Sequence, residues 1–250
     1  MAPPPFLSIV IPAYNEQSRL GPTLAAVLDW ARHFPRGAEV IVVDDGSTDA
    51  TADVARRGIE SAGIQATLLV NERNRGKGYS LRRGVLAARG TMVLLSDADL
   101  STPIEQTERL LEHMSRMGRG VVIGSRALKD SNVEVHQNPV REVMGKVFNR
   151  AVRLMTGLPF HDTQCGFKLM TREDVTPIFR KARIDGFSYD VELLYVAVRR
   201  GLPVAEVGVP WRNAPGSKVG MLTDPLKMLA DVMRIRRWYR QGGYAEEADA

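Results

Sequence analysis

Two acids separated by one small residue, Asp97 and Asp99, have the spacing that most suggests chemistry in this sequence. They follow the apolar run 92–95, which predicts a buried strand, and open α/β sheets bind ligands beyond the carboxyl ends of their strands. Two carboxylates this close repel each other unless a cation lies between them, and oxygen ligands suit Mg²⁺ or Mn²⁺. The pair therefore indicates a divalent ion that carries a diphosphate, or else a plainer helix cap or turn.

A second acid pair, Asp44 and Asp45, follows the apolar run 40–43 and precedes a glycine. Taken alone, it predicts a turn into a helix that Ser47 or Thr48 caps. Its position after a second strand also allows a role beside the first acid pair, since the carboxyl ends of parallel strands meet at one edge of a sheet.

Lys77 stands between two glycines and opens a further helix. The Gly-Lys pair has no glycine five residues before it, and no Gly-x-Gly-x-x-Gly follows the first strand. Both common nucleotide-binding fingerprints are therefore absent from the sequence.

The elements that must position these residues alternate between strand and helix. Apolar and β-branched runs predict strands, and apolar residues at helical spacing predict the helices between them. This alternation predicts an α/β fold with a doubly wound, mostly parallel sheet. The expected strands cover 6–11, 40–43, 66–70, 92–95 and 121–123, and the helices between them end near residues 34, 62, 88 and 117.

The pattern is less regular after residue 126. We expect a polar loop followed by helices and short strands, with a capping box at the start of one helix and acids near the start of another. The segments are a loop at 129–139, a helix at 141–156, a short strand ending near 170, a capping box at 171–174, a helix at 187–199, a strand at 204–210, a loop at 211–219 and a closing helix at 225–240.

Composition sets limits on function. The 250 residues carry 44% hydrophobic and 25% charged residues, typical of a globular protein, and a formal net charge of +5 favours an anionic partner. The single cysteine, Cys165, excludes an intramolecular disulfide, and the four histidines show no ligand spacing. We expect no signal peptide, and no stretch reaches the ~18 apolar residues of a spanning helix, so a membrane role would be peripheral.

Three motifs resemble the nucleotide-sugar motifs of family 2 glycosyltransferases in order and spacing: 8–16, 42–47 and 97–99. The resemblance implies a GT-A fold with a Rossmann-like nucleotide-binding half, inversion at the anomeric carbon, and Mg²⁺ or Mn²⁺. Segments 124–126, 144–149, 162–168, 189–194 and 216–218 are similar to the polyprenyl-phosphate branch, most of all its dolichyl-phosphate glucose synthases, with mannose synthases as near neighbours.

The resemblance covers about residues 8–240 and implies one glycosyltransferase domain over 1–240. That domain would divide into a nucleotide-sugar half (6–125), an acceptor half (126–224) and a basic amphipathic helix (225–240), with an acidic tail at 241–250.

The resemblance also implies residue roles. Asp97 and Asp99 would hold the metal, and Arg126 and Arg141 would grip the lipid phosphate, a task that suits the planar fork of arginine. Ser101 departs from some mannose synthases, which carry glutamine there. The remaining substrate-binding residues would be Pro12, Tyr14, Glu16 and Asp44 around uridine, Asp45 and Lys77 beside it, and Asp162, Gln164 and Lys218 on the acceptor side.

The acceptor decides whether a general base is required. A phosphate monoester with a second pKa near ~6 is largely dianionic at neutral pH and attacks without losing a proton. A hydroxyl acceptor needs a carboxylate to take its proton, and Asp190 is then the candidate. With a phosphate acceptor, Asp190, Asp162 or Glu192 would order the acceptor loop or the arginines.

The sequence therefore predicts an inverting, metal-dependent transfer of a hexose, glucose from UDP-glucose, to a polyprenyl phosphate at the cytoplasmic face of a membrane. Alternatives are a GDP-mannose enzyme, a family 2 enzyme with a hydroxyl acceptor, and a phosphotransferase, whose nucleophilic acid would belong after the first strand. A nucleic-acid-binding domain would explain the positive charge but not acids at two strand ends, which repel phosphate without a metal.

The closing helix has two interpretations. Its apolar residues lie broadly on one side, with basic residues around them, which fits either a core-packing helix with a basic outer face or a helix resting on anionic lipid. The apolar set is Leu226, Leu229, Ala230, Met233 and Trp238, and the basic set is Lys227, Arg234, Arg236, Arg237 and Arg240.

Overall fold

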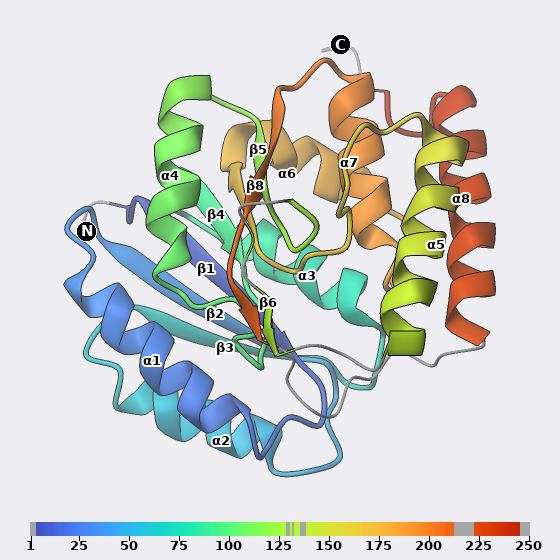
Figure 1. Cartoon of the computed structure of the whole chain (residues 1–250). Helices are drawn as coiled ribbons and strands as arrows, with labels where there is room; N and C mark the ends of the chain where they lie inside the picture. The colour runs from blue at the N-terminus through green and yellow to red at the C-terminus, as the bar shows by residue number, and fades with distance from the viewer. Residues whose placement is uncertain (1–3, 129–130, 132, 136–138, 213–222, 246–250) are drawn as a thin grey trace.

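The computed structural model describes residues 4–128, 131, 133–135, 139–212 and 223–245 (Figure 1). A seven-stranded sheet runs through its centre, built of β1 (Leu7–Ala13), β2 (Ala38–Asp44), β3 (Ala66–Val70), β4 (Met92–Leu95), β5 (Val121–Ser125), β7 (Lys168–Thr171) and β8 (Val204–Gly208). The strand order is β3-β2-β1-β4-β7-β5-β8. Neighbouring strands are parallel except for β7, which is antiparallel to both β4 and β5.

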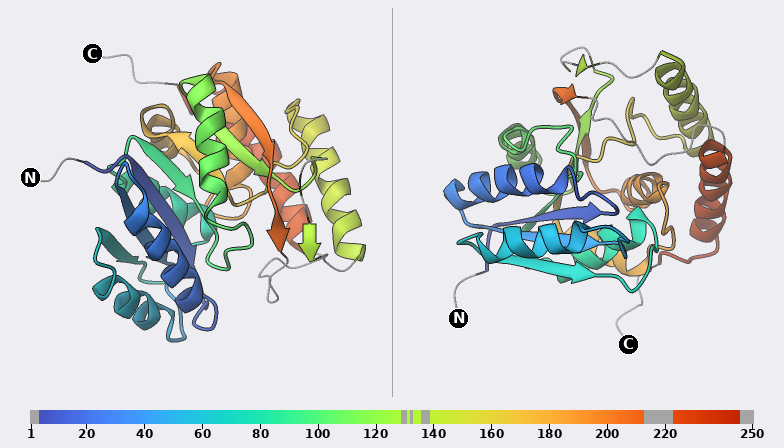
Figure 2. Two further views of the ribbon diagram at one scale, coloured as in Figure 1. Left: turned by 60° about the vertical axis from the view of Figure 1, so that its left-hand side comes forward. Right: turned by 90° about the horizontal axis from the view of Figure 1, so that it is seen from below.

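Helices cover both faces of this sheet. They are α1 (Leu20–His33), α2 (Thr51–Glu60), α3 (Lys77–Ala87), α4 (Gln106–Met117), α5 (Pro139–Thr156), α6 (Arg172–Lys181), α7 (Tyr189–Arg199) and α8 (Thr223–Arg240). Buried residues of α1, α2 and α4 form one core with the sheet, and those of α3, α5, α6, α7 and α8 form the other. Figure 2 shows α5 and α8 side by side at one edge of the molecule.

The strand sequences explain why both faces are covered. Ile9 and Ile11 of β1 pack into the core under α1, α2 and α4, whereas Val10 between them packs into the other core. Because side chains alternate between faces and all three are apolar, the strand is stable only with a helical layer on each side. The predicted doubly wound, mostly parallel sheet is confirmed.

The predicted elements agree with the observed ones to within a few residues, with two additions. β1 runs on through Pro12 to Ala13, so Pro12 pairs with Val43 of β2 instead of opening a loop. A small parallel pair, β6 (Val133–Val135) and β9 (Trp211–Arg212), forms where loops were expected. The rest of the two expected loops falls partly on residues 129–130, 132, 136–138 and 213–222, which lie outside the described residues.

Both predicted side-chain caps are wrong. α2 begins only at Thr51, and the Ser47 hydroxyl accepts a hydrogen bond from the Asn15 backbone N–H at 2.9 Å instead. Thr171 precedes α6 but makes no capping bond, and Asp174 accepts from the backbone N–H of Gly120 at 2.9 Å. In both places the side chain that a local cap would need is hydrogen-bonded to a backbone N–H group that is distant in the sequence.

Among the described residues, no helix combines the length and apolarity required to cross a bilayer.

Candidate active site

The acids after β4 lie in a tight turn. The Nζ of Lys77 donates to Asp97 Oδ1 at 2.6 Å, and Ser101 donates to Asp99 Oδ1 from its backbone N–H at 3.0 Å and its hydroxyl at 2.8 Å. Leu100 adopts φ +48°, which is strained for a bulky side chain. Such strain concentrates at functional sites, because the surrounding structure must hold it.

Asp97 sits among cations. Loss of solvent would raise its pKa, but Lys77, and then Lys168 and Arg126, lower the pKa below its ordinary value. Loss of solvent would likewise lower the pKa of Lys77, but Asp97, Asp190 and Asp99 raise it. Asp97 is therefore ionised and Lys77 protonated at neutral pH. Because Arg126 influences Asp97, the predicted metal site and the predicted acceptor arginine lie in one site.

Glu16 joins this turn through a residue that the sequence did not single out. Arg19 makes two bonds of 2.7 Å to the carboxylate of Glu16, and its Nη1 lies 3.7 Å from Asp99 Oδ2. Glu16 itself is fixed by its backbone N–H, which donates to Thr51 Oγ1 at 2.7 Å. Glu16 thus acts on the acid turn through Arg19, and its carboxylate is engaged in that ion pair.

The two acids after β2 differ in role. Asp45 accepts from Asn71 Nδ2 at 2.6 Å and from the backbone N–H groups of Arg75 and Gly76 at 2.9 and 2.8 Å. Both its oxygens are engaged, so Asp45 holds the loop that leads into Lys77. Asp44 lies at the end of β2, with Oδ2 accepting from the Ser47 N–H at 3.3 Å.

Within the described part of the chain, Asp44 Oδ1 is buried without a hydrogen-bond partner. A buried acceptor left unpaired is costly, so it marks a place for a donor from a bound molecule. The neighbouring loop after β1 carries Tyr14, which is partly buried, and Asn15, whose Oδ1 accepts from the Thr48 N–H at 2.9 Å. These contacts tie the loops after β1 and β2 into one wall of the site.

On the predicted acceptor side, Arg126 forms a two-pronged ion pair with Asp162. Its Nε and Nη2 donate to the carboxylate at 2.6 and 2.9 Å, and its backbone N–H donates at 3.0 Å. Asp162 is held by its own N–H, which donates to Glu206 at 2.8 Å, and the Arg126 guanidinium lies 5.4 Å from the Trp211 ring centre. The third guanidinium nitrogen, Nη1, takes no part in the two side-chain bonds to Asp162.

The two partners keep each other charged although both are buried. Loss of solvent would raise the pKa of Asp162, but Arg126 lowers it below the ordinary value. The same carboxylate raises the pKa of Arg126 against the effect of burial. Gln164 lies in the same loop, with its N–H donating to Asp162 at 3.2 Å. Arg141 belongs to α5, but its side chain and all of Lys218 lie outside the described residues.

Asp190, at the start of α7, pairs with a lysine that the sequence analysis missed. Lys168 is fully buried in β7 and donates to Asp190 and to the Cys165 carbonyl oxygen. Burial raises the pKa of Asp190, and Lys168 and Lys77 lower it only in part, so the net shift is upward. The signal was available, since a lysine inside an apolar strand needs a partner in the core.

Gly166 is a second residue that sequence reasoning passed over. A Cβ built at Gly166 would lie 2.5 Å from the Asp97 Cγ, far inside van der Waals contact. The loop between Asp162 and β7 therefore rests directly on the Asp97 carboxylate, and only glycine permits that approach.

The donor set fits a divalent ion that is shared with substrate. Asp97 and Asp99 supply carboxylate oxygens, and no group of three or more metal-ligating side chains forms among the described residues. Mg²⁺ is usually held by one or two carboxylates together with substrate phosphates, not by an all-protein cage. A divalent metal with a diphosphate therefore suits these two acids, whereas a closed structural site does not.

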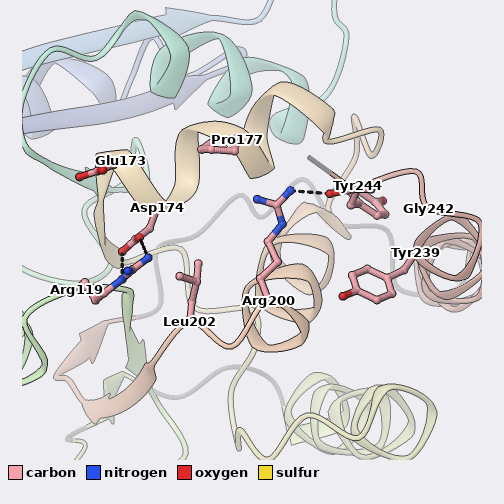
Figure 3. A pocket seen from close by; sticks show the side chains of 10 residues that line it. Arg119, Glu173, Asp174, Pro177, Arg200, Leu202, Tyr239, Gly242 and Tyr244 are labelled. Carbon is pink, nitrogen blue, oxygen red and sulfur yellow. Dashed lines mark hydrogen bonds and ion pairs between the residues drawn. The ribbon is translucent and has the colours of Figure 1, made fainter. Parts of the chain in front are cut away.

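Figure 3 shows a separate cavity of about 710 Å³. It lies beside the residues that precede β5 and β8, at the sheet edge opposite to Asp97 and Asp99. Arg119, paired with Asp174, and Arg200, which donates to the Tyr244 carbonyl oxygen at 2.6 Å, line it. None of the predicted site residues borders this cavity.

The sequence model of glycosyl transferase family 2 matches residues 8–179, which include both acid pairs and Arg126. The chain belongs to glycosyl transferase family 2. Among curated family 2 relatives, it is 36% identical over 249 residues to the dolichyl-phosphate beta-glucosyltransferase of Dictyostelium discoideum, covering 95% of this chain and 76% of the relative. It is 34% identical to the mouse enzyme of the same name, covering 95% of this chain and 77% of that one. The protein is a glycosyltransferase.

Solved structures show the same fold. Glucosyl-3-phosphoglycerate synthase from Mycobacterium tuberculosis, solved with Mn²⁺, UDP and glucosyl-3-phosphoglycerate, matches with a TM-score of 0.66 at 23% identity, over 95% of this chain and 80% of that one. Mannosyl-3-phosphoglycerate synthase from Rubrobacter xylanophilus matches with a TM-score of 0.66 at 20% identity, over 97% and 77%. These neighbours confirm the predicted GT-A fold of this family 2 chain.

Proposed function

We propose that the protein transfers glucose from UDP-glucose to a polyprenyl phosphate of the dolichyl type, with inversion to a β-linked product. The names of the relatives support the sugar and the acceptor. The proposal rests mainly on one observation. The turn that carries Asp97 and Asp99 lies at the same sheet edge as Arg126, and Arg126 is close enough to lower the pKa of Asp97. Such a site brings a metal-bound diphosphate and a second phosphate together.

On the donor side, Asp44 supplies the specificity for the base. Its unpaired, buried Oδ1 is an acceptor that suits the imide N–H of uracil, and burial excludes water as a competitor. Asp97 and Asp99 would hold Mg²⁺ or Mn²⁺, which neutralises the charge of the departing nucleoside diphosphate. Lys77 adds a second cation beside Asp97, so the leaving group departs into a positive environment.

On the acceptor side, Arg126 presents Nη1 to the lipid phosphate while Asp162 fixes the other two nitrogens. An arginine locked in this way loses little side-chain freedom when it binds phosphate. The phosphate dianion attacks the anomeric carbon without a base, and Asp190, buried against Lys168, serves as a positioning residue. By this account Asp45 and Glu16 also position neighbours and do not touch substrate.

The experiment measures initial rates of transfer from UDP-glucose to polyprenyl phosphate for the wild type and two site variants. Asp99→Asn should lose at least about 100-fold in kcat/KM, as expected when a metal ligand is weakened. Arg126→Lys should raise the KM for the lipid phosphate and leave the KM for UDP-glucose nearly unchanged, because lysine cannot reproduce the fork.

Two exposed residues far from the site provide matched controls, Asp29→Asn on α1 and Arg57→Lys on α2. Wild-type rates in both controls with losses in both site variants support the proposal. Turnover with GDP-mannose in place of UDP-glucose contradicts the donor assignment, and turnover that persists in Asp99→Asn contradicts the metal site.

A further inference from the structure

The outer faces of α5 and α8 form an exposed apolar and basic surface. The two helices pack against each other at one edge of the molecule (Figures 1 and 2). The four most exposed large apolar side chains among the described residues all belong to them: Leu154 at 80%, Leu226 at 71%, Val147 at 63% and Met233 at 58%. Such exposure in one place marks an interaction surface.

Helical spacing gathers these side chains into one stripe on each helix. Val147, Arg150 and Leu154 follow each other at intervals of three and four on α5, and Leu226, Met233 and Arg237 share one side of α8. The inner sides are buried, through Phe148 and Val152 on α5 and Met228, Val232 and Ile235 on α8. One side of each helix therefore packs in the core, and the opposite side is exposed.

Among the side chains that the structure describes, the charge on this surface is almost entirely positive. Its exposed cations are Arg150, Arg153, Lys227, Arg234, Arg237 and Arg240. Among the side chains that the structure describes on α5 and α8, the single carboxylate is that of Asp231, which pairs with Arg234 at 3.2 Å. A second copy of this surface would bring like charges together, so a symmetric dimer through it is disfavoured.

We propose that the α5–α8 surface docks the protein on an anionic lipid membrane. Leucine and methionine interleaved with arginine on a helix lying flat is the pattern that seats in the lipid headgroup region, with apolar side chains inserted and cations beside the phosphates. Docking of this kind would bring the lipid acceptor of the proposed function close to the site. Vesicle binding tests the docking without any glucosyl transfer.

The same helix connects the docking surface to the acceptor side of the site. Asn149, which points away from the stripe of Val147 and Leu154, bonds to the His161 carbonyl oxygen and accepts from the Thr163 hydroxyl at 3.2 Å. These two residues flank Asp162, the partner of Arg126. Docking through the outside of α5 thus brings the membrane next to the loop that holds the acceptor arginine.

The test is co-sedimentation of the full chain with vesicles of equal parts phosphatidylglycerol and phosphatidylcholine, and with vesicles of phosphatidylcholine alone. The wild type should bind the anionic vesicles, and added salt should weaken binding because screening reduces the charge attraction. Arg153→Glu with Arg237→Glu should reduce the partition coefficient at least about 25-fold, since each basic side chain contributes about fivefold. Its matched control is Arg57→Glu with Arg180→Glu, exposed arginines of α2 and α6 that make the same change in net charge.

The apolar contribution is tested by Leu154→Ser with Leu226→Ser, which should weaken binding about tenfold or more because two exposed leucines no longer insert. The control is Val70→Ser with Leu86→Ser, the exposed apolar side chains of β3 and α3. All these side chains are exposed, so the fold should survive each change, and circular dichroism verifies it.

Three results would overturn the inference: no wild-type binding to anionic vesicles, equal losses in the controls, or a concentration-dependent dimer that the leucine variant abolishes without vesicle binding. The proposed function fails separately, because transfer to a short-chain polyprenyl phosphate in detergent does not require docking. In that assay the arginine and leucine variants should keep wild-type rates.

Discussion

Replacing Lys168 with methionine tests the buried charge pair beneath the site. Lys168 is fully buried and contacts the carboxylate of Asp190, which is 4% exposed. Methionine fills much of the same space without the charge. Removing one member of a buried ion pair leaves the other uncompensated, so we expect Lys168→Met to lower the free energy of unfolding by about 3–5 kcal/mol near pH 8.

The loss should depend on pH in a defined direction. Burial already raises the pKa of Asp190 above that of an ordinary aspartate, although Lys168 and Lys77 lower it in part. Without Lys168 the folded pKa rises further, so the folded variant retains a proton that the unfolded chain releases. Its stability therefore falls as pH rises from the unfolded pKa toward the raised folded pKa, and the deficit against wild type is smallest in acid.

Urea unfolding followed by circular dichroism at about pH 5 and pH 8 measures both effects. The double variant Lys168→Met with Asp190→Leu removes both charges together. Its loss in free energy of unfolding should therefore be smaller than the sum of the two single-variant losses by at least about 1 kcal/mol. A single-variant loss below about 1 kcal/mol near pH 8, or an equal loss at both pH values, would refute this reasoning.

Three further predictions concern neighbouring residues. Gly166→Ala should raise the Mn²⁺ concentration for half-maximal transfer about 10–100-fold by displacing Asp97, and an unchanged metal titration contradicts the packing. Asp45→Asn should cost about 1–3 kcal/mol in urea unfolding and raise the KM for the donor, because an amide cannot accept both backbone N–H groups that lead into Lys77. Burial raises the pKa of Cys165 to about 11, so its reaction with a disulfide reagent at about pH 8 should be roughly 100-fold slower than in urea; equal rates would contradict its burial.

Much of the fold was accessible from the sequence because strands and helices here follow simple periodicity. The runs 40–43 within β2 and 92–95 in β4 are apolar at every position, as strands covered on both faces must be, and the acids at the ends of these runs mark the carboxyl edge. The antiparallel direction of β7 was not predictable, since a four-residue strand carries no signal of direction. The cap predictions failed because Ser47 and Asp174 bond to distant backbone groups that local sequence does not reveal.

The sequence predicted where the candidate metal- and nucleotide-binding acids lie in the fold, and it did not predict which residues hold them in place. Asp44 is the last residue of β2 and Asp97 lies two residues after β4, so the strand pattern alone fixes their place. Arg19, Glu206 and Gly166 act across gaps of many residues, and their roles follow from packing. Asp45 shows most clearly what the sequence does not reveal. It is an aspartate next to Asp44, but both of its carboxylate oxygens accept hydrogen bonds from the segment that leads into Lys77.

The central claim, glucosyl transfer to a lipid phosphate, is tested most directly by offering one donor and two acceptors. Radiolabelled UDP-glucose is incubated with polyprenyl phosphate and, separately, with the polyprenol of equal chain length, each with Mn²⁺ and with a chelator. The account predicts a labelled lipid only from the phosphate, and only with metal, because a dianionic acceptor needs no base. Label on the polyprenol, or a product formed equally in the presence of chelator, would contradict it and return Asp190 to consideration as a general base.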